Sequence, residues 1–253
     1  MKFYQKPDTY QMRAEESVLF LTAVHGDEGF SIPVLQALGL HIPWLIANEK
    51  ALARGVRFID ADLNRVAPGC ATSDKYEVRR ASELIEIAKK YPSVIDIHGT
   101  TANSGIFTIV TNPTPVNFAL ATSLPIERVV IWVAKSSEMQ GPLTQFMNCA
   151  VEIECGPKNS KEVWIELEEI LGRFLYFRSS AGGHWSHLVY PEHEWFRVCG
   201  KLGKEISLQG KSLVDFQEVE LHGESFYPLL VGQYADALCY KMQKINFWDM
   251  LSY

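Results

Sequence analysis

Two histidines and one glutamate occupy positions at which they could bind a metal ion together. His25 and Glu28 follow an apolar run at residues 18–24, and His98 follows another at residues 94–97. Ligands of open α/β sheets gather at the carboxyl ends of the strands, so two neighbouring strands could bring these side chains to one point. Two imidazoles and a carboxylate suit a catalytic zinc ion, which keeps a further position for water. Taken singly, each residue has a simpler explanation, as a hydrogen-bonded structural histidine or a solvated carboxylate.

The segment 57–65 is polar and irregular, with more ionisable groups than an ordinary connection carries. An arginine beside the planar amide of Asn64 can hold a carboxylate through paired hydrogen bonds, and a second arginine can stabilise an oxyanion. Arg57 and Arg65 are the two candidates. A surface ion-pair cluster with the two aspartates of the segment explains the same residues equally well.

Two glutamates, Glu152 and Glu154, alternate with apolar residues in a segment that we expect to be a strand. Side chains two residues apart in a strand point to the same face, so both carboxylates share one side. One of them could face a cleft and act as a general base. An exposed edge strand would produce the same pattern without any function.

The elements that must position these residues alternate between strands and helices. Residues 18–24 are almost continuously apolar, which indicates a strand covered on both faces. A helix is predicted over residues 78–88, opened by a capping box at Asp74-x-x-Glu77, and a strand follows directly at residues 94–97. Further strands are expected at 44–47, 105–111, 128–133 and 150–154, and further helices at 32–40 and from Ser160. This order predicts an α/β fold with a mixed central sheet flanked by helices.

The residue pattern of the sequence changes near Ser179. A glycine-containing stretch at 179–183 is followed by short β-like runs separated by glycines. We therefore expect a first domain over residues 1–178 and a small, mainly β second domain over residues 179–253. His184 and His187 are expected to lie in a loop near the mouth of the cleft rather than in a second metal site.

Bulk properties exclude several classes of function. A net charge of −6 over 253 residues argues against a nucleic-acid partner, because phosphate backbones attract basic surfaces. No uninterrupted apolar run reaches the roughly 18 residues of a membrane span, and the N-terminus lacks the apolar core of a secretion signal. We therefore expect a cytoplasmic protein with no membrane partner. The five scattered cysteines include no Cys-x-x-Cys pair and are expected to be reduced and mostly buried.

Four motifs occur in an order that resembles the succinylglutamate desuccinylase/aspartoacylase family, a branch of the zinc carboxypeptidase-like hydrolases. They are His25-Gly-Asp-Glu28, Arg57 with Asp62-Leu-Asn-Arg65, Asp96-Ile-His98-Gly-Thr-Thr and Glu154-Cys-Gly-Pro. The resemblance covers the first two thirds of the chain by motif and the last third by general texture. It implies a mixed sheet with flanking helices and a small C-terminal β domain that narrows the substrate channel.

The resemblance also implies a role for each matching residue. His25, Glu28 and His98 match the ligands of one Zn²⁺ ion, and Arg57 matches the arginine that polarises the scissile carbonyl. Asn64 and Arg65 match the pair that holds the free carboxylate of the substrate, and Thr100 would lie beside that substrate. Glu154 matches the general acid/base because it stands one residue before Gly-Pro, a frame that Glu152 does not fit.

Some positions depart from the family pattern. In aspartoacylase an arginine ten residues before the catalytic glutamate binds the acidic side chain of the substrate. The residue at the matching position of this sequence is Thr144. Lys135 or Arg128 is a possible substitute. The tyrosine that the family contributes from its C-terminal domain has two counterparts, Tyr234 and Tyr240, of which Tyr234 is the candidate for substrate binding. The chain is also shorter than typical members.

The favoured hypothesis is a zinc-dependent amidohydrolase that cleaves the amide bond of an N-acyl amino acid or a related small carboxylate, with water activated by zinc and Glu154. A carboxypeptidase or cell-wall peptide amidase is the second reading, and a catalytically inactive zinc-binding module is the third. A closed channel would favour small substrates and an open groove would favour peptides. The family often forms dimers, so a homodimer is possible.

Overall fold

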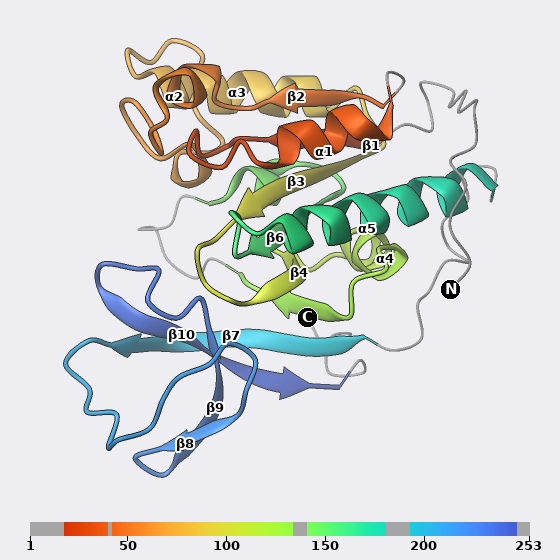
Figure 1. Ribbon diagram of the computed structural model, residues 1–253. Coiled ribbons are helices and arrows are strands. Elements are labelled where there is room, and N and C mark those ends of the chain that lie inside the picture. Colours follow the sequence, from red (N-terminus) through yellow and green to blue (C-terminus); the bar gives the residue numbers. More distant parts are fainter. Residues whose placement is uncertain (1–17, 40–41, 134–140, 181–192, 247–253) are drawn as a thin grey trace.

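The computed structural model describes residues 18–39, 42–133, 141–180 and 193–246 of the 253-residue chain. Ten strands form one mixed sheet in the order β2-β1-β3-β6-β4-β5-β7-β10-β9-β8 (Figure 1). The strands are β1 Val18–Thr22, β2 Trp44–Ile46, β3 Ser93–Gly99, β4 Gly105–Val110, β5 Arg128–Ile131, β6 Ala150–Gly156, β7 Glu194–Gly203, β8 Val219–Leu221, β9 Glu224–Leu229 and β10 Ala237–Ile245. The helices are α1 Ser31–Leu38, α2 Glu49–Arg54, α3 Tyr76–Ala88, α4 Pro115–Ser123 and α5 Lys161–Ser180, with short 3₁₀ helices η2 Leu63–Arg65 and η3 Leu143–Phe146.

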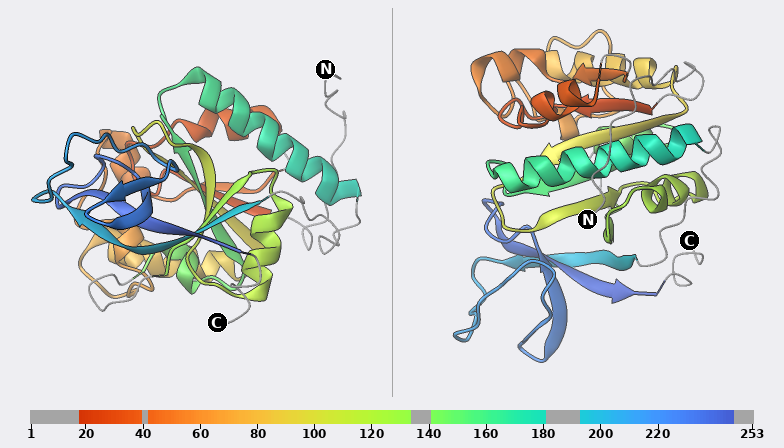
Figure 2. Two further views of the ribbon diagram at one scale, coloured as in Figure 1. Left: turned by 90° about the horizontal axis from the view of Figure 1, so that it is seen from below. Right: turned by 45° about the vertical axis from the view of Figure 1, so that its right-hand side comes forward.

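Helices cover both faces of the sheet, as the sequence predicts. In β1, Val18 and Phe20 pack into the cluster that contains α1 and α5, whereas Leu19 and Leu21 pack into the cluster that contains α3. Figure 2 shows α5 and α3 on opposite sides of the strands. Alternate side chains of the same strand are therefore buried on both sides, which explains the continuous apolar run.

Strand direction determines where polar groups can meet. β1 pairs in parallel with β2 and β3, and β3 pairs in parallel with β6. β4 runs antiparallel to β6, while β5 is parallel to both β4 and β7. The carboxyl ends of β1, β3 and β6 consequently lie at one edge of the sheet, next to each other. This edge is where the predicted site residues follow their strands.

Glu77 does not form the predicted capping box. Helix α3 begins at Tyr76 after Lys75, and no side chain caps its first turn. The buried carboxylate of Glu77 instead accepts hydrogen bonds from the backbone N–H groups of Ile59 (2.6 Å), Asp60 (2.9 Å) and Ala61 (3.2 Å) and from Asn48 Nδ2 (3.2 Å). The capping interpretation was wrong because tertiary contacts with the segment 59–61 take the carboxylate that the local pattern assigned to the helix.

Replacing Glu77 by Ala should lower the free energy of unfolding by about 3 kcal/mol, because one buried donor (Asn48) and three part-buried backbone donors would lose their acceptor. Urea denaturation measures this change. Glu86→Ala, an exposed position on the same helix, is the matched control and should stay near the wild-type value. An unchanged midpoint for Glu77→Ala would contradict the role of Glu77 in holding this segment.

Two helices were not predicted, although their ends carry recognisable signals. Helix α4 begins with Pro115 in its first turn, where proline is tolerated, and the Thr114 side chain accepts a hydrogen bond from Asn117 N at 3.3 Å. Helix α2 begins after Asn48, which caps Ala51 N, and it ends at Gly55 with a φ of 61°. Helix α2 has only six residues, and α4 buries polar as well as apolar side chains, so neither has a clear apolar stripe.

The C-terminal β region extends the central sheet. β7 pairs with β5, and β10 then pairs with β7 and β9. Helix α5 ends at Ser180, two residues beyond the expected boundary at 178/179. The division into two domains remains a prediction, while the mainly β character of this region is confirmed.

The cysteines agree with the expectation of reduced thiols. All five are free, with Cys149, Cys155 and Cys239 buried and Cys70 and Cys199 exposed. Among the described residues, no helix has the length and apolar character that crossing a membrane requires.

Candidate functional site

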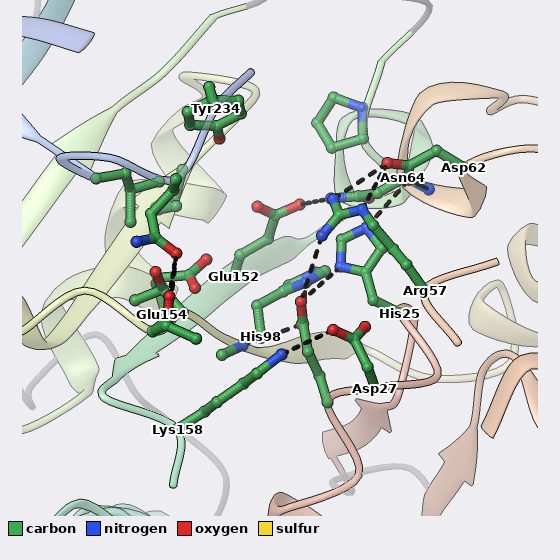
Figure 3. A pocket seen from close by; sticks show the side chains of 18 of the residues that line it. His25, Asp27, Arg57, Asp62, Asn64, His98, Glu152, Glu154, Lys158 and Tyr234 are labelled. Carbon is green, nitrogen blue, oxygen red and sulfur yellow. Dashed lines mark hydrogen bonds and ion pairs between the residues drawn. The ribbon is translucent and has the colours of Figure 1, made fainter. Parts of the chain in front are cut away.

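A cavity of about 480 Å³ lies at the carboxyl ends of β1, β3 and β6. Its walls include the proposed metal ligands, the proposed catalytic residues and the favoured substrate-binding residues, namely His25, Glu28, Arg57, Asn64, Arg65, His98, Thr100, Glu154 and Tyr234. Figure 3 shows most of these side chains around a common space. The volume is in the range of small-molecule sites in proteins.

His25, Glu28 and His98 bring their ligand atoms together. Nδ1 of His25 lies 3.0 Å from Oε1 of Glu28, and Nδ1 of His98 lies 3.3 Å from Oε2 of the same carboxylate. All three side chains are buried. Ligands about 2.0–2.1 Å from a tetrahedral zinc ion are separated by roughly 3.3 Å. These residues form a group that could hold a metal ion, and their donor types fit zinc.

Each of these histidines has its second ring nitrogen fixed by a carboxylate. Nε2 of His25 lies 3.0 Å from Oδ1 of Asp62, and Nε2 of His98 lies 3.0 Å from Oδ2 of Asp96. Carboxylates in this position orient metal-binding imidazoles and make them better ligands. A second possible group, Asp96 with His98 and Glu152, shares His98 with the first. The contact of Asp96 with the outer nitrogen marks it as a residue that supports His98.

The carboxylates around His25 and His98 favour a positive charge between these side chains. Burial alone would lower the pKa of His98, but Asp96 and Glu28 raise it well above its usual value. Burial alone would raise the pKa of Glu28, but His25 and His98 hold it below its usual range. The cluster is therefore stabilised by positive charge, which a proton or a divalent cation can supply.

The segment 57–65 delivers Arg57, Asn64 and Arg65 to the cavity. Arg57 donates to Oδ2 of Asp62 from Nε (3.3 Å) and Nη2 (3.1 Å), and its Nη1 lies 3.6 Å from Glu28. An ion pair with an aspartate does form, but it lies in the cavity and leaves the Arg57 side chain 44% exposed. Arg65 donates from Nη1 to the carbonyl oxygen of Asn64 at 2.8 Å.

The Asn64 amide is engaged within the protein. Its Oδ1 accepts a hydrogen bond from Leu143 N at 2.9 Å, and its Nδ2 donates to Glu152 Oε1 at 3.3 Å. Asn64 is also buried. Its contacts join η2 to η3 and to β6, so it helps to fix the wall of the cavity next to Arg65.

Glu154 stands opposite His98 in the pairing of β6 with β3, and Glu152 stands opposite Asp96. β6 lies between β3 and β4, so the explanation by an exposed edge strand is wrong. The Glu154 carboxylate makes no hydrogen bond or ion pair with any residue of the described ranges. Burial, reinforced by the nearby Glu28 carboxylate, raises the pKa of Glu154 to about 8. An unpaired carboxyl with this pKa is suited to proton transfer near neutral pH.

The loop between β9 and β10 forms the wall contributed by the C-terminal region. Of the two candidate tyrosines, Tyr234 lines the cavity, while Tyr240 is buried behind it with ring centroids 4.9 Å apart. Gln233 was not predicted, and its Oε1 accepts hydrogen bonds from Thr101 N (3.2 Å) and Thr101 Oγ1 (2.7 Å). These bonds attach the loop to the end of β3, and no local sequence signal points to them.

Lys158 is a second residue that sequence reasoning missed. It lines the cavity, and its Nζ lies 2.9 Å from Oδ2 of Asp27. Its backbone N–H donates to the carbonyl oxygen of Thr100 at 2.7 Å, which holds Thr100 at the edge of the cavity. Lys158 follows directly on the Glu154-Cys-Gly-Pro motif, so the position was available as a signal.

The suggested substitutes for the missing arginine do not lie in the described part of the cavity. Arg128 stacks on Phe216 at 4.7 Å and donates to Ser104 O, and it is not among the residues that line the cavity. Thr144 is buried and bonds to Thr111 and Glu152. Lys135, His184 and His187 lie outside the described residues.

Comparisons with known proteins agree with this geometry. A model of the succinylglutamate desuccinylase/aspartoacylase catalytic domain matches residues 14–165, more than half of the chain. A probable aspartoacylase from Prochlorococcus marinus is 29% identical over 184 residues, which cover 64% of this chain and 60% of that protein. An N-acyl-aromatic-L-amino acid amidohydrolase (carboxylate-forming) from Xenopus laevis is 44% identical over 71 residues, which cover 24% of this chain and 23% of that protein.

Among solved structures, murine aminoacylase 3 has a TM-score of 0.70 with 18% sequence identity, covering 90% of this chain and 95% of that chain. This likeness shows that the two proteins share a fold. The alignment with the Prochlorococcus protein, by contrast, spans about 60% of the length of that relative.

Proposed function

Because this chain belongs to the succinylglutamate desuccinylase/aspartoacylase family, we propose that it is a zinc-dependent amidohydrolase that cleaves the amide bond of an N-acyl amino acid. The observation that carries the proposal is the convergence of three ligand side chains, an unpaired carboxyl and an arginine on one cavity of about 480 Å³. A purely structural metal site needs neither a base nor an oxyanion donor.

His25, Glu28 and His98 would hold the zinc ion, which supplies a Lewis acid that makes water nucleophilic at neutral pH. Glu154 accepts the proton of the attacking water and later returns it to the leaving amine. The exposed face of Arg57 polarises the amide carbonyl and stabilises the negative charge that develops on its oxygen. Asp62 holds both Arg57 and His25, which keeps the oxyanion donor at a fixed place relative to the metal ligands.

Arg65 would bind the free carboxylate of the substrate, with Asn64 fixing the wall beside it and Thr100 lying at the rim. Tyr234 lines the cavity from the C-terminal side. A cavity wall contributed by the C-terminal region favours a small acylated amino acid as the substrate, because a peptide substrate requires an open groove. The relatives from Prochlorococcus and Xenopus carry names of this chemical class.

A panel of N-acetyl, N-succinyl and N-formyl amino acids, assayed for release of the amine, tests the proposal. We expect release from at least one N-acyl series, loss of that release with a chelator, and recovery with added zinc. Short peptides with a free C-terminus serve as the comparison. Hydrolysis of peptides alone, or no release from a protein that has zinc bound, would contradict the proposed function.

A further inference from the structure

Glu152 is a buried carboxylate on the floor of the cavity that the proposed reaction does not use. The residue is 5% exposed and lines the cavity. Its Oε1 accepts hydrogen bonds from Asn64 Nδ2 (3.3 Å) and Thr144 Oγ1 (3.0 Å). Its Oε2 accepts none from any residue in the described ranges. Figure 3 shows this second oxygen on the side away from Asn64, toward Tyr234.

An apolar and aromatic wall surrounds this free oxygen. Ile109 on β4 stands opposite Glu152 on β6, and Thr111 follows directly after the end of β4. Trp132 N donates to Val110 O, so the pairing of β5 with β4 continues to the level of Thr111 and Trp132. Ile109, Thr111, Trp132, Leu230 and Tyr234 all line the cavity. The space beyond Glu152 can therefore accommodate the methylene groups of a short ligand side chain.

Two arginines and one lysine of the described residues line the cavity, Arg57, Arg65 and Lys158, and none of them forms an ion pair with Glu152. Arg65 donates to the carbonyl oxygen of Asn64 and is the residue that would bind the free carboxylate of the substrate. Arg57 pairs with Asp62 and Glu28, and Lys158 pairs with Asp27. In Figure 3, Arg57 and Lys158 lie on the other side of Glu152 from Tyr234.

Among the described residues, none forms an ion pair with Glu152. A ring nitrogen of His98 lies within 4.8 Å of a Glu152 oxygen, but no hydrogen bond joins the two side chains. A buried carboxylate is costly without a direct cationic partner, and a ligand can supply one.

We propose that Glu152 and this wall form a subsite for the substrate's side chain, and that the subsite takes a short, positively charged side chain. An ammonium group would donate to Oε2 of Glu152 and face the rings of Trp132 and Tyr234, which also attract cations. An anionic side chain would meet the carboxylates of Glu152 and Glu154. Among the described residues, the arginine of the cavity that lies outside an ion pair is Arg65, which would already hold the free carboxylate of the substrate. The inference rests on the proposed function, because it names the substrate class of the same cavity.

Three substrates of similar size provide the test: Nα-acetyl-L-ornithine, its neutral isostere Nα-acetyl-L-norleucine, and Nα-acetyl-L-glutamate. With the zinc-loaded protein, we expect kcat/KM to be highest for the ornithine compound and lowest for the glutamate compound. In Glu152→Gln, which keeps the acceptor for Asn64 and Thr144, the ratio of kcat/KM for ornithine to norleucine should fall roughly ten- to a hundredfold. Both substrates are assayed with the same preparation of each variant. The ratio of the two kcat/KM values therefore does not depend on the fraction of the protein that is folded.

Glu166→Gln is the matched control, because it removes the same charge from the exposed face of α5 and should keep the wild-type ratio. A preference for the glutamate compound, or an unchanged ratio in Glu152→Gln, would overturn the inference and leave the proposed amidohydrolase activity standing. If none of the three is hydrolysed, calorimetric binding of free ornithine, norleucine and glutamate still decides the preference of the subsite. Ornithine must then bind tightest, and equal or tighter binding of glutamate would overturn the inference.

Discussion

A Glu154→Gln variant should hydrolyse N-acyl amino acids about two to four orders of magnitude more slowly than the wild type while it binds zinc normally. The amide of glutamine cannot accept the proton of the attacking water or return it to the leaving amine. Glu154 makes no hydrogen bond within the described ranges, so the substitution breaks no contact there. Steady-state kinetics and metal analysis of the same preparation separate the two effects.

The control for this variant is Glu166→Gln, on the exposed side of α5, which should keep full activity. An active Glu154→Gln enzyme would show that another group transfers the proton, and Glu152 would then be the carboxylate to test. Loss of zinc together with activity would instead mean that Glu154 helps to hold the metal site together.

A His98→Ala variant should lose both zinc and activity, because it removes one of three side-chain ligands from the buried cluster. Asp96→Asn should have a milder effect, with zinc affinity lowered about 10- to 100-fold, because His98 keeps its ligand nitrogen but loses its carboxylate support. Competition with a chromophoric chelator measures both affinities.

His222→Ala is the matched control, since this histidine is exposed and bonds to Ser207 O far along the chain from the ligands. The zinc affinity of the His222→Ala variant should equal that of the wild type. Normal zinc binding by His98→Ala would refute the assignment of the ligand set. Equal losses in Asp96→Asn and His98→Ala would indicate that Asp96 is itself a ligand.

Local sequence was sufficient for the strands and helices that carry strong periodicity. β1 and β3 follow from apolar runs, β6 from an alternating pattern, and α3 and α5 from a helical stripe, and the structure places all five near the predicted ranges. Helix α2 was missed because six residues give little periodic signal, and α4 was missed because its buried face mixes polar and apolar side chains. Residue order also led to the proposed ligand set, since the two motifs that contain it follow strands whose carboxyl ends lie at the same edge of the sheet.

Contacts between segments distant in the sequence could not be predicted, because nothing local encodes them. Glu77 looked like a helix cap, yet it binds the segment 59–61. Gln233 joins the C-terminal loop to Thr101, 132 residues away. The choice of Tyr234 over Tyr240 as the cavity residue depends on how that loop returns over the sheet.

The sequence by itself determined the fold class and the candidate metal ligands, because these depend on residue type and on order along alternating strands and helices. The choice of Glu154 over Glu152 as the proposed base came from the family resemblance. Only the tertiary structure decided which carboxylates support His25 and His98, and that Glu152 faces the cavity with one oxygen free. Those features arise where β3, β6, η2 and η3 pack together. Substrate preference is therefore a property of packing, whereas the proposed reaction type is already present in the order of the motifs.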